Sequence, residues 1–213
     1  MRPNRNLNPR PRKRALLIQC EGLKTEPNYL EEFCKACGIR HSLVVKVKPG
    51  KGQNAAVTVE AAIAEGRRRL LGEQVYDEVW CVLDVEHAAH KAKLNEAITL
   101  AGKYGIRLFL SNPSFEVWLI SHFERTKRDF ADSDATEAHL NTHWKKHFGC
   151  DYEKGDPGLY FKLKERLGDA QVNAQWVLET FHSHKPCWES NPSTMVYQVI
   201  NELLTRSGLK AAI

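Results

Sequence analysis

The sequence predicts an α/β fold: a parallel sheet of about four strands flanked by helices, with a helical C-terminal extension. Four short apolar runs alternate with segments whose apolar residues recur at helical spacing, which is typical of a parallel sheet with right-handed crossovers. The run Val79–Leu83 is apolar at every position, as expected for a strand that is buried on both faces. From about residue 126 onward the chain is polar, charged and mostly helical in pattern.

Each predicted strand is a short apolar run, and each is followed by a helical pattern. The first of these helices carries Tyr29 and Phe33 on its apolar face, and the second covers about Ala55–Leu71. The fourth helix begins at Pro113 or Ser114. The four strands are expected at Ala15–Cys20, Leu43–Val47, Val79–Leu83 and Ile106–Leu110.

The C-terminal region is expected to add helices that pack on the same domain. A last helix is predicted to be capped by Asn191, with Pro192 at its first helical position. The chain therefore divides into a basic disordered arm (1–14), a main α/β domain (15–125) and a helical region (126–213). The earlier helices of that region cover about Thr136–Phe148, Gly158–Leu167 and Ala170–His182.

Three histidines in this region, His139, His143 and His147, recur every fourth residue and therefore share one face of a helix. Imidazole side chains on one helix face are potential zinc ligands. No acidic partner stands at a matching spacing in the sequence, so packing or surface exposure is favoured over zinc binding for these three side chains.

Length and composition are those of an ordinary globular chain. Its 213 residues suffice for one large domain, and no apolar run approaches the length of a membrane-spanning helix. The basic N-terminus is not followed by an apolar segment of signal-peptide length. A cytoplasmic protein without a membrane span is therefore expected, and its six cysteines would stay reduced there.

Positive charge is concentrated in the first 14 residues. This arm contains six basic residues and no acidic one, so the remainder of the chain carries −1 of the net charge of +5. A basic, proline-containing arm suits contact with nucleic-acid phosphates or another acidic partner, and it is equally typical of a solvated tail. Arg2 and Arg5 add to its charge, and the predicted nucleic-acid contacts are Arg10, Arg12, Lys13 and Arg14.

Acidic residues follow three of the predicted strands. Glu21 comes directly after the first strand, Asp84 and Glu86 after the third, and Glu116 shortly after the fourth. Ligands of open α/β sheets bind beyond the carboxyl ends of the strands, so these carboxylates are expected to meet at one edge. Adjacent carboxylates repel each other without a positive partner, and Mg²⁺ or Mn²⁺ prefers carboxylate oxygens. The sequence predicts a metal site with Asp84, Glu86 and Glu116 as ligands.

Glu21 is the carboxylate that is not assigned to the metal, and it is therefore available for proton transfer. One such carboxylate beside a metal-bound pair is the minimum for metal-assisted phosphodiester chemistry. Lys24, Glu26 and His87 lie next to these motifs and are expected to support them. Structural alternatives stay open at this point: Asp84 can be the N-cap of the next helix, and Glu116 can simply favour a helix dipole.

This pattern resembles a known domain, because Toprim domains carry a glutamate after one strand and an acid-x-acid pair after another. Glu21-Gly22 and Asp84-x-Glu86 match that arrangement. More narrowly, four motifs resemble the RloB family, and the likeness spans about residues 13–205. The motifs are Cys20-Glu21-Gly22-Leu23-Lys24-Thr25-Glu26-Pro27-Asn28-Tyr29, Trp80-Cys81-Val82-Leu83-Asp84, Ser111-Asn112-Pro113-Ser114-Phe115-Glu116-Val117-Trp118-Leu119 and Asn191-Pro192-Ser193-Thr194.

The resemblance implies a Toprim effector of a bacterial anti-phage abortive-infection system, whose other half is an ABC/AAA-type ATPase. It implies Glu21 as general acid/base and Asp84 and Glu86 as Mg²⁺ ligands. In nucleases related to the overcoming-lysogenisation-defect family, a further acid helps to hold metal, and Glu116 matches it. One departure is Glu86, because the usual pair is Asp-x-Asp and the longer side chain alters the metal geometry.

Two functions follow from the sequence. The leading hypothesis is a metal-dependent nuclease that acts on RNA, including tRNA, or on DNA. The alternative is a non-catalytic Toprim-like module that binds a partner ATPase or nucleic acid, and a homo-oligomer is compatible with both. The absence of Gly-x-Gly-x-x-Gly or Walker patterns argues against a Rossmann-like nucleotide binder, and the length leaves no room for the cleavage domain of a topoisomerase.

Overall fold

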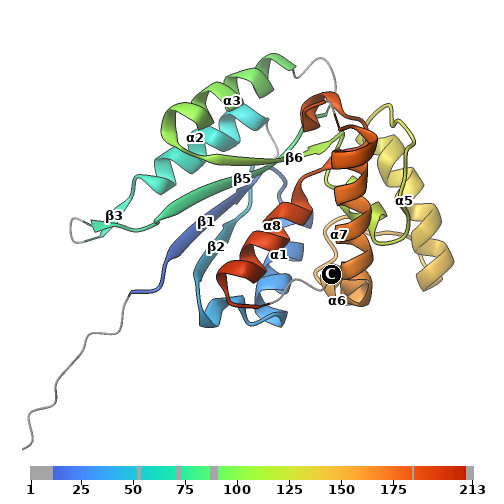
Figure 1. The fold of residues 1–213 in the computed structure, drawn as a ribbon, viewed down its shortest axis with the longest axis horizontal. Helices are drawn as coiled ribbons and strands as arrows, with labels where there is room; N and C mark the ends of the chain where they lie inside the picture. The colour runs from blue at the N-terminus through green and yellow to red at the C-terminus, as the bar shows by residue number, and fades with distance from the viewer. Residues whose placement is uncertain (1–11, 52–53, 71–72, 87–90, 184, 210–213) are drawn as a thin grey trace, which may run out of the picture.

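A five-stranded, mostly parallel sheet forms the centre of the protein (Figure 1). The computed structural model describes residues 12–51, 54–70, 73–86, 91–183 and 185–209. The strand order is β2-β1-β5-β6-β7, and β7 alone runs antiparallel to its neighbour. The predicted four-stranded parallel sheet is therefore confirmed, with a short fifth strand added at one edge. The strands are β1 Ala15–Cys20, β2 Val44–Lys48, β5 Glu78–Asp84, β6 Arg107–Asn112 and β7 Ser193–Thr194.

Strand β5 is apolar at successive positions because its two faces serve different cores. Trp80 and Val82 belong to one buried cluster, and Cys81 and Leu83 belong to another on the opposite face. Helices α2 (Ala55–Gly66) and α3 (Lys91–Tyr104) cover the second face, while α1 (Thr25–Ala36) and α8 (Val196–Arg206) cover the first (Figure 1). This helix–sheet–helix arrangement is Rossmann/Toprim-like.

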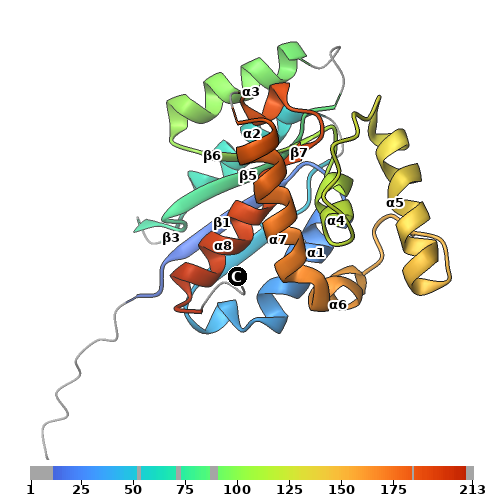
Figure 2. The same ribbon diagram turned by 45° about the vertical axis from the view of Figure 1, so that its right-hand side comes forward.

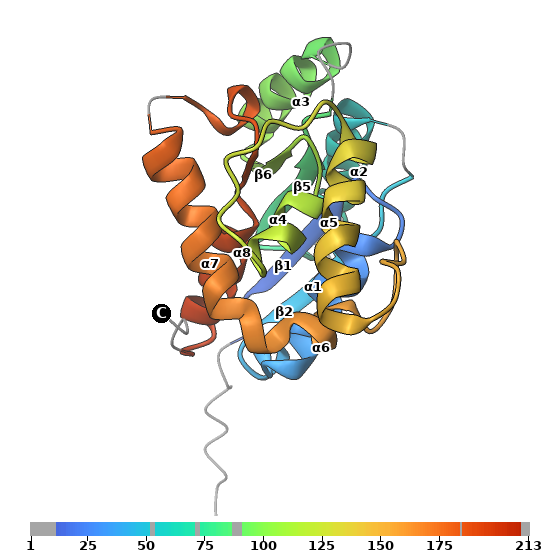
Figure 3. The ribbon, with the colours of Figure 1, turned by 90° about the vertical axis from the view of Figure 1, so that its right-hand side faces the viewer.

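The second half of the chain packs on the α1 side of the sheet. Leu140, Leu159 and Ala170 share one buried cluster with Trp80 of the sheet. Helices α7 and α8 lie side by side (Figures 1 and 2), and α7 and α5 flank α4 in Figure 3. These elements are α4 Glu116–Ser121, α5 Ser133–Phe148, α6 Leu159–Leu163 and α7 Leu167–Trp176, with short helical turns at Ile39–His41, Lys164–Arg166, Val177–Phe181 and Cys187–Glu189.

The predicted end of the second helix was wrong. Helix α2 ends at Gly66, and the chain then enters a small antiparallel pair formed by β3 (Arg69–Leu70) and β4 (Glu73–Gln74). A Cβ atom at Gly66 would lie 2.7 Å from Cγ2 of Val79, so the helix end sits directly on the sheet. The hydrogen bonds between β3 and β4 satisfy backbone N–H and C=O groups that would otherwise have been paired within a longer helix.

The predicted start of the last helix was also wrong. Asn191 does not cap it, because α8 begins at Val196 and Ser193–Thr194 forms β7 beside β6. The side chain of Asn191 instead donates to the carbonyl of Phe130 (2.7 Å) and accepts from its N–H (3.2 Å). This pairing ties the segment before β7 to the segment before α5. No helix in the described part of the chain is long and apolar enough to cross a membrane.

Candidate functional site

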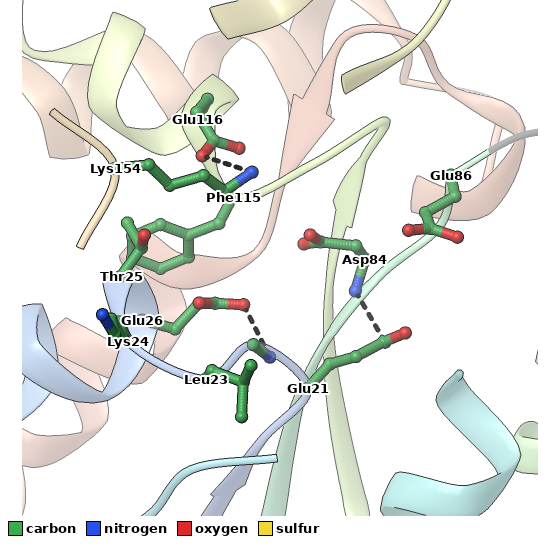
Figure 4. A pocket seen from close by; sticks show the side chains of 11 residues that line it. Glu21, Leu23, Lys24, Thr25, Glu26, Asp84, Glu86, Phe115, Glu116 and Lys154 are labelled. Atoms are coloured by element: carbon green, nitrogen blue, oxygen red, sulfur yellow. Dashed lines mark hydrogen bonds and ion pairs between the residues drawn. The ribbon is translucent and has the colours of Figure 1, made fainter. Parts of the chain in front are cut away.

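A cavity of about 350 Å³ opens at the carboxyl ends of β1 and β5, where the sequence predicted a site (Figure 4). The four predicted carboxylates, those of Glu21, Asp84, Glu86 and Glu116, line it together. The supporting residues Lys24 and Glu26 line it as well. The structure therefore brings together every described residue that was predicted for the acidic site. The remaining lining residues are Gly22, Leu23, Thr25, Phe115 and Lys154.

Glu21 is held at the end of β1 by the neighbouring strand. Its N–H donates to the carbonyl of Val82 (3.0 Å), which extends the β1–β5 ladder by one residue. Its carboxylate Oε2 accepts from the N–H of Asp84 (3.2 Å). The sheet ladder thus links the first acidic motif directly to the second, and Glu21 is only 8% exposed.

Two glycines allow the chain to turn tightly after Glu21. A Cβ atom at Gly50 would lie 1.9 Å from the carbonyl oxygen of Glu21, and one at Gly22 would lie 2.1 Å from Oε2 of Glu26. The backbone therefore leaves no room for a side chain at Gly50, whereas at Gly22 the carboxylate of Glu26 occupies the space. Gly50 donates its N–H to the carbonyl of Gly22 (3.0 Å), and Gly22 donates to Oε1 of Glu26 (3.0 Å).

The Asp84-x-Glu86 motif begins at the last residue of β5 and then runs beside the carboxyl end of β6. The N–H of Val85 donates to the carbonyl of Ser111 (2.8 Å), and that of Glu86 donates to the carbonyl of Pro113 (2.9 Å). Glu86 has a φ of 52°, a left-handed conformation that is uncommon for residues other than glycine. Such backbone conformations concentrate at functional sites. Asp84 and Glu86 both remain partly accessible from the cavity.

Glu116 begins α4 and is buried, with only 2% of its surface exposed. Its carboxylate accepts from the hydroxyl of Ser114 (2.7 Å) and from that of Tyr152 (3.5 Å). The ammonium group of Lys154 lies 3.5 Å from Oε1 of Glu116 (Figure 4). Tyr152 and Lys154 escaped the sequence analysis because they approach from the loop after α5, and no local pattern marks such a distant contact.

The crowding of carboxylates changes their protonation. Burial, with smaller contributions from Glu86 and Glu26, raises the pKa of Glu21 to about 7. Burial also raises the pKa of Asp84 well above its usual range, and nearby Glu26 and Glu116 raise it further. The pKa of Glu26 is raised for the same reasons. Each of these groups would ionise more readily beside a cation.

Lys154 lines this cavity and forms an ion pair with the carboxylate of Glu116. Although burial works in the opposite direction, Glu116 and Glu137 raise the pKa of Lys154. Its ammonium group therefore stays charged at neutral pH. Lys24 is exposed at the cavity rim, with its stem against Gly155.

The donor set of the cavity fits a hard divalent cation. All of its acidic ligand atoms are carboxylate oxygens, which Mg²⁺ and Mn²⁺ prefer. The raised pKa values of Glu21, Glu26 and Asp84 also indicate a shortage of positive charge. Within the described residues, no three of these carboxylates bring ligand atoms within 4.8 Å of one another, so binding of an ion requires side-chain rotation.

The basic arm joins the protein at the opposite end of β1. Arg12 pairs with Asp77 (2.7 Å) and Arg14 pairs with Glu78 (3.4 Å), beside the first residues of β5. Lys13 reaches the carbonyl of Arg40 (3.4 Å). These three predicted contacts therefore lie at the amino edge of the sheet, away from the acidic cavity. The predicted residues Arg10 and His87 lie outside the described residues.

The fold and the acidic cavity define an α/β protein with a carboxylate-rich site at the carboxyl edge of a parallel sheet. Residues 16–203, most of the chain, match the family described as RloB-like protein. The chain therefore belongs to the RloB-like family, which confirms the resemblance drawn from its four motifs. No curated protein and no solved structure matches the chain.

Proposed function

We propose that the protein is a metal-dependent nuclease that cleaves phosphodiester bonds of RNA, including tRNA, or of DNA. The observation that carries the proposal is the acidic cavity, in which Glu21, Asp84, Glu86 and Glu116 converge from the ends of three parallel strands. Parallel α/β sheets bind their ligands at this edge. The cavity is open enough for Lys154, which is more than half exposed, to reach a phosphate from the same side.

Glu21 is proposed as the general acid/base. A catalytic group works best when its pKa lies near the working pH, and burial brings the pKa of Glu21 to about 7. The hydrogen bond from the N–H of Asp84 holds its carboxylate in one orientation. Glu21 can therefore take a proton from an attacking water and return it to the leaving oxygen.

Asp84, Glu86 and Glu116 are proposed to hold Mg²⁺ or Mn²⁺, with Glu26 as a supporting carboxylate. A bound ion would polarise the scissile phosphate and stabilise charge on the attacking and leaving oxygens. The hydroxyls of Ser114 and Tyr152 hold the carboxylate of Glu116 by hydrogen bonds, which would orient it for metal binding. Lys154 supplies a positive charge that attracts the phosphate.

The family supports a wider role as the Toprim effector of an anti-phage abortive-infection system. We include a partner ATPase in this proposal, since the resemblance implies one, and a cytoplasmic setting, which is expected from the sequence. The arm residues Arg10, Arg12, Lys13 and Arg14 are proposed to contact the nucleic acid outside the active site. Because Arg12 and Arg14 pair with carboxylates at the sheet edge, their contribution would require exchange of these ion pairs.

A non-catalytic interaction module is the second candidate. Two observations favour it: Glu86 stands where the related pattern has aspartate, and the cavity carboxylates do not approach as closely as metal ligands do. Such a module would bind an ATPase or nucleic acid through the same surfaces without cutting.

Cleavage of bulk tRNA and of plasmid DNA, in Mg²⁺ and in Mn²⁺, tests these alternatives. Wild type is compared with Asp84→Asn and with the control Glu165→Gln, whose side chain is 86% exposed and remote from the cavity. We expect wild type and the control to cut one substrate class and Asp84→Asn to be inactive. Equal cutting by all three proteins would contradict the proposed site. Binding of nucleic acid without cutting, in either metal, would support the interaction module instead.

A further inference from the structure

A second group of potential metal ligands lies outside the acidic cavity. His139 and His143 stand one turn apart on α5, and Glu124 approaches them from the segment after α4. Nε2 of His139 lies 2.8 Å from Oε1 of Glu124, and Nε2 of His143 lies 3.3 Å from Oε2. One ligand atom from each residue lies within 4.8 Å of the others, and this is the only such trio among the described residues.

The chemistry of this trio differs from that of the acidic cavity. Imidazole nitrogen suits Zn²⁺, Co²⁺ and Ni²⁺, whereas Mg²⁺ prefers an all-oxygen site. Tetrahedral ligands at Zn–N and Zn–O bond lengths near 2.0–2.1 Å lie about 3.4 Å apart. The separation of 3.3 Å between His143 and Glu124 is close to this value, and the hydrogen-bonded separation of 2.8 Å between His139 and Glu124 must lengthen to admit an ion. Two histidines and one carboxylate leave the fourth position for water.

The three side chains are held in place by their surroundings. The ring of His143 stacks on Phe123, with centroids 5.6 Å apart and planes at 12°, and His139 contacts the ring of Phe130 at 5.4 Å. The side chains of His139 and His143 are only 17% and 18% exposed. A site with restrained ligands loses less conformational entropy when it binds an ion.

The charges around the trio are compatible with a cation. Two positive groups are near the trio: Nη1 of Arg128 lies 3.5 Å from Nδ1 of His139, and Lys146 acts electrostatically on His143. A metal on Nε2 requires a proton on Nδ1, so the guanidinium must turn away from that nitrogen. Arg128 is exposed and therefore free to move into solvent. His147, one turn further along α5, contacts Arg166 and lies outside the trio.

We propose that Glu124, His139 and His143 bind a divalent transition-metal ion of the zinc class. The ion would fasten α5 to the end of α4. The loop after α5 carries Tyr152 and Lys154 to Glu116, so the second site would also stabilise one wall of the acidic cavity. No spacing in the sequence marks this trio, because Glu124 lies outside the helix that carries the two histidines.

Cobalt titration of metal-free, tag-free protein tests the proposal. Asp84→Asn serves as the background, so that the acidic cavity does not compete for the ion. We expect one equivalent of Co²⁺ to bind with the visible absorption of a low-symmetry site, and Zn²⁺ to displace it. His139→Ala with His143→Ala should weaken binding by more than about a hundredfold, because losing even an outer-shell partner costs 10–100-fold. The control His147→Ala should bind like the background.

No cobalt binding in the background protein, or equal binding in the double variant, would overturn the proposal. Glu124→Gln is a second variant, since its amide retains the shape of the carboxylate while losing its charge, and it should also weaken binding. To verify folding, the far-ultraviolet circular dichroism and the thermal unfolding of the metal-free double variant are compared with those of the metal-free background protein. These measurements do not depend on nuclease activity, so failure of the second site and failure of the proposed function are distinguished.

Discussion

At the scale of single residues, Asp84 lies where carboxylates crowd together, which costs stability in the absence of a cation. Its carboxylate is held among Glu21, Glu26, Glu86 and Glu116, and both burial and these neighbours raise its pKa. Without a cation, the protein must either protonate this group or tolerate repulsion. Functional sites often carry such destabilising arrangements, and relieving them commonly increases stability.

Asp84→Asn is therefore expected to stabilise the metal-free protein. The amide keeps the shape of the side chain and removes one of the crowded like charges, which we expect to add about 1–2 kcal/mol to the free energy of unfolding. Denaturant unfolding in EDTA measures this, with Glu165→Gln as an exposed control expected to have little effect. A loss of stability in Asp84→Asn would mean that the repulsion among the carboxylates is already relieved.

Glu21 is expected to make stability depend on pH. Its pKa in the folded protein is about 7, above its ordinary value of 4.5, so the folded state binds the proton more tightly than the unfolded state. The stabilisation is complete below about pH 4.5 and is lost as the pH rises through 7. The difference corresponds to about 3 kcal/mol.

Comparison of wild type with Glu21→Gln isolates this effect from the other titrating groups. In EDTA, wild type should lose more stability than Glu21→Gln between pH 5 and pH 8. Parallel profiles for the two proteins would show that Glu21 titrates normally. Added Mg²⁺ should reduce the wild-type loss at pH 8, since a cation favours the ionised carboxylate.

At the scale of elements, the turn after β1 depends on its contact with the loop that contains Gly50. Gly50→Ala would place a Cβ atom 1.9 Å from the carbonyl oxygen of Glu21, so either the loop or the turn must move. We expect a loss of about 1–3 kcal/mol in stability and weaker Mn²⁺ binding, because Glu21 shifts with the turn. Thermal unfolding and Mn²⁺ titration measure these effects.

Gly102→Ala is the matched control for that substitution. Gly102 lies in α3 with no atom within 4 Å of a built Cβ, and alanine is the better helix former. It should stabilise the protein by about 0.5–1 kcal/mol and leave Mn²⁺ binding unchanged. Equal effects from the two substitutions would contradict the close packing proposed around Gly50.

The elements that could be predicted from the sequence are those with local signals. The apolar run at Val79–Leu83 and the helical periodicities predicted the sheet and its crossovers. Strand β7 could not be predicted because its two residues carry no periodicity and pair with residues far away in the chain. Asn191 has the residue type of a helix cap, yet its side chain bonds to Phe130 instead.

The same distinction holds for the candidate site. The carboxylates at strand ends could be predicted because parallel strands bring their carboxyl ends to one edge. Lys154 and Tyr152 could not, since their contacts with Glu116 depend on the path of α5 and the loop after it. Glu124 was missed for the same physical reason.

At the scale of the whole molecule, residues 12–14 of the basic arm and the acidic cavity lie at opposite ends of β1. A strand of this length spans about 20 Å, so one nucleic acid must extend along the sheet to meet both. The arm therefore suits general attraction of a polyanion, whereas the cavity would select the bond that is cut.

Removal of residues 1–11 is expected to weaken nucleic-acid binding without changing cleavage at saturating substrate. This deletion removes Arg2, Arg5 and Arg10, so the salt dependence of duplex DNA binding should fall by up to about 2.7 in logarithmic slope. Fluorescence anisotropy at several salt concentrations measures the slope. Substitution of these three arginines by glutamine is the control for charge, and an unchanged slope in both proteins would leave the arm without a binding role.

The late pairing of β7 with β6 has a consequence for synthesis of the protein. The hydroxyls of Ser111 and Thr194 are hydrogen-bonded although the two residues are 83 positions apart. While the chain is still on the ribosome, the carboxyl end of β6 at Ser111 and Asn112 has no partner until Ser193 and Thr194 are made, and its backbone groups are open to other strands. A nascent chain released early, before residue 193, would keep that edge exposed and be prone to aggregate through it.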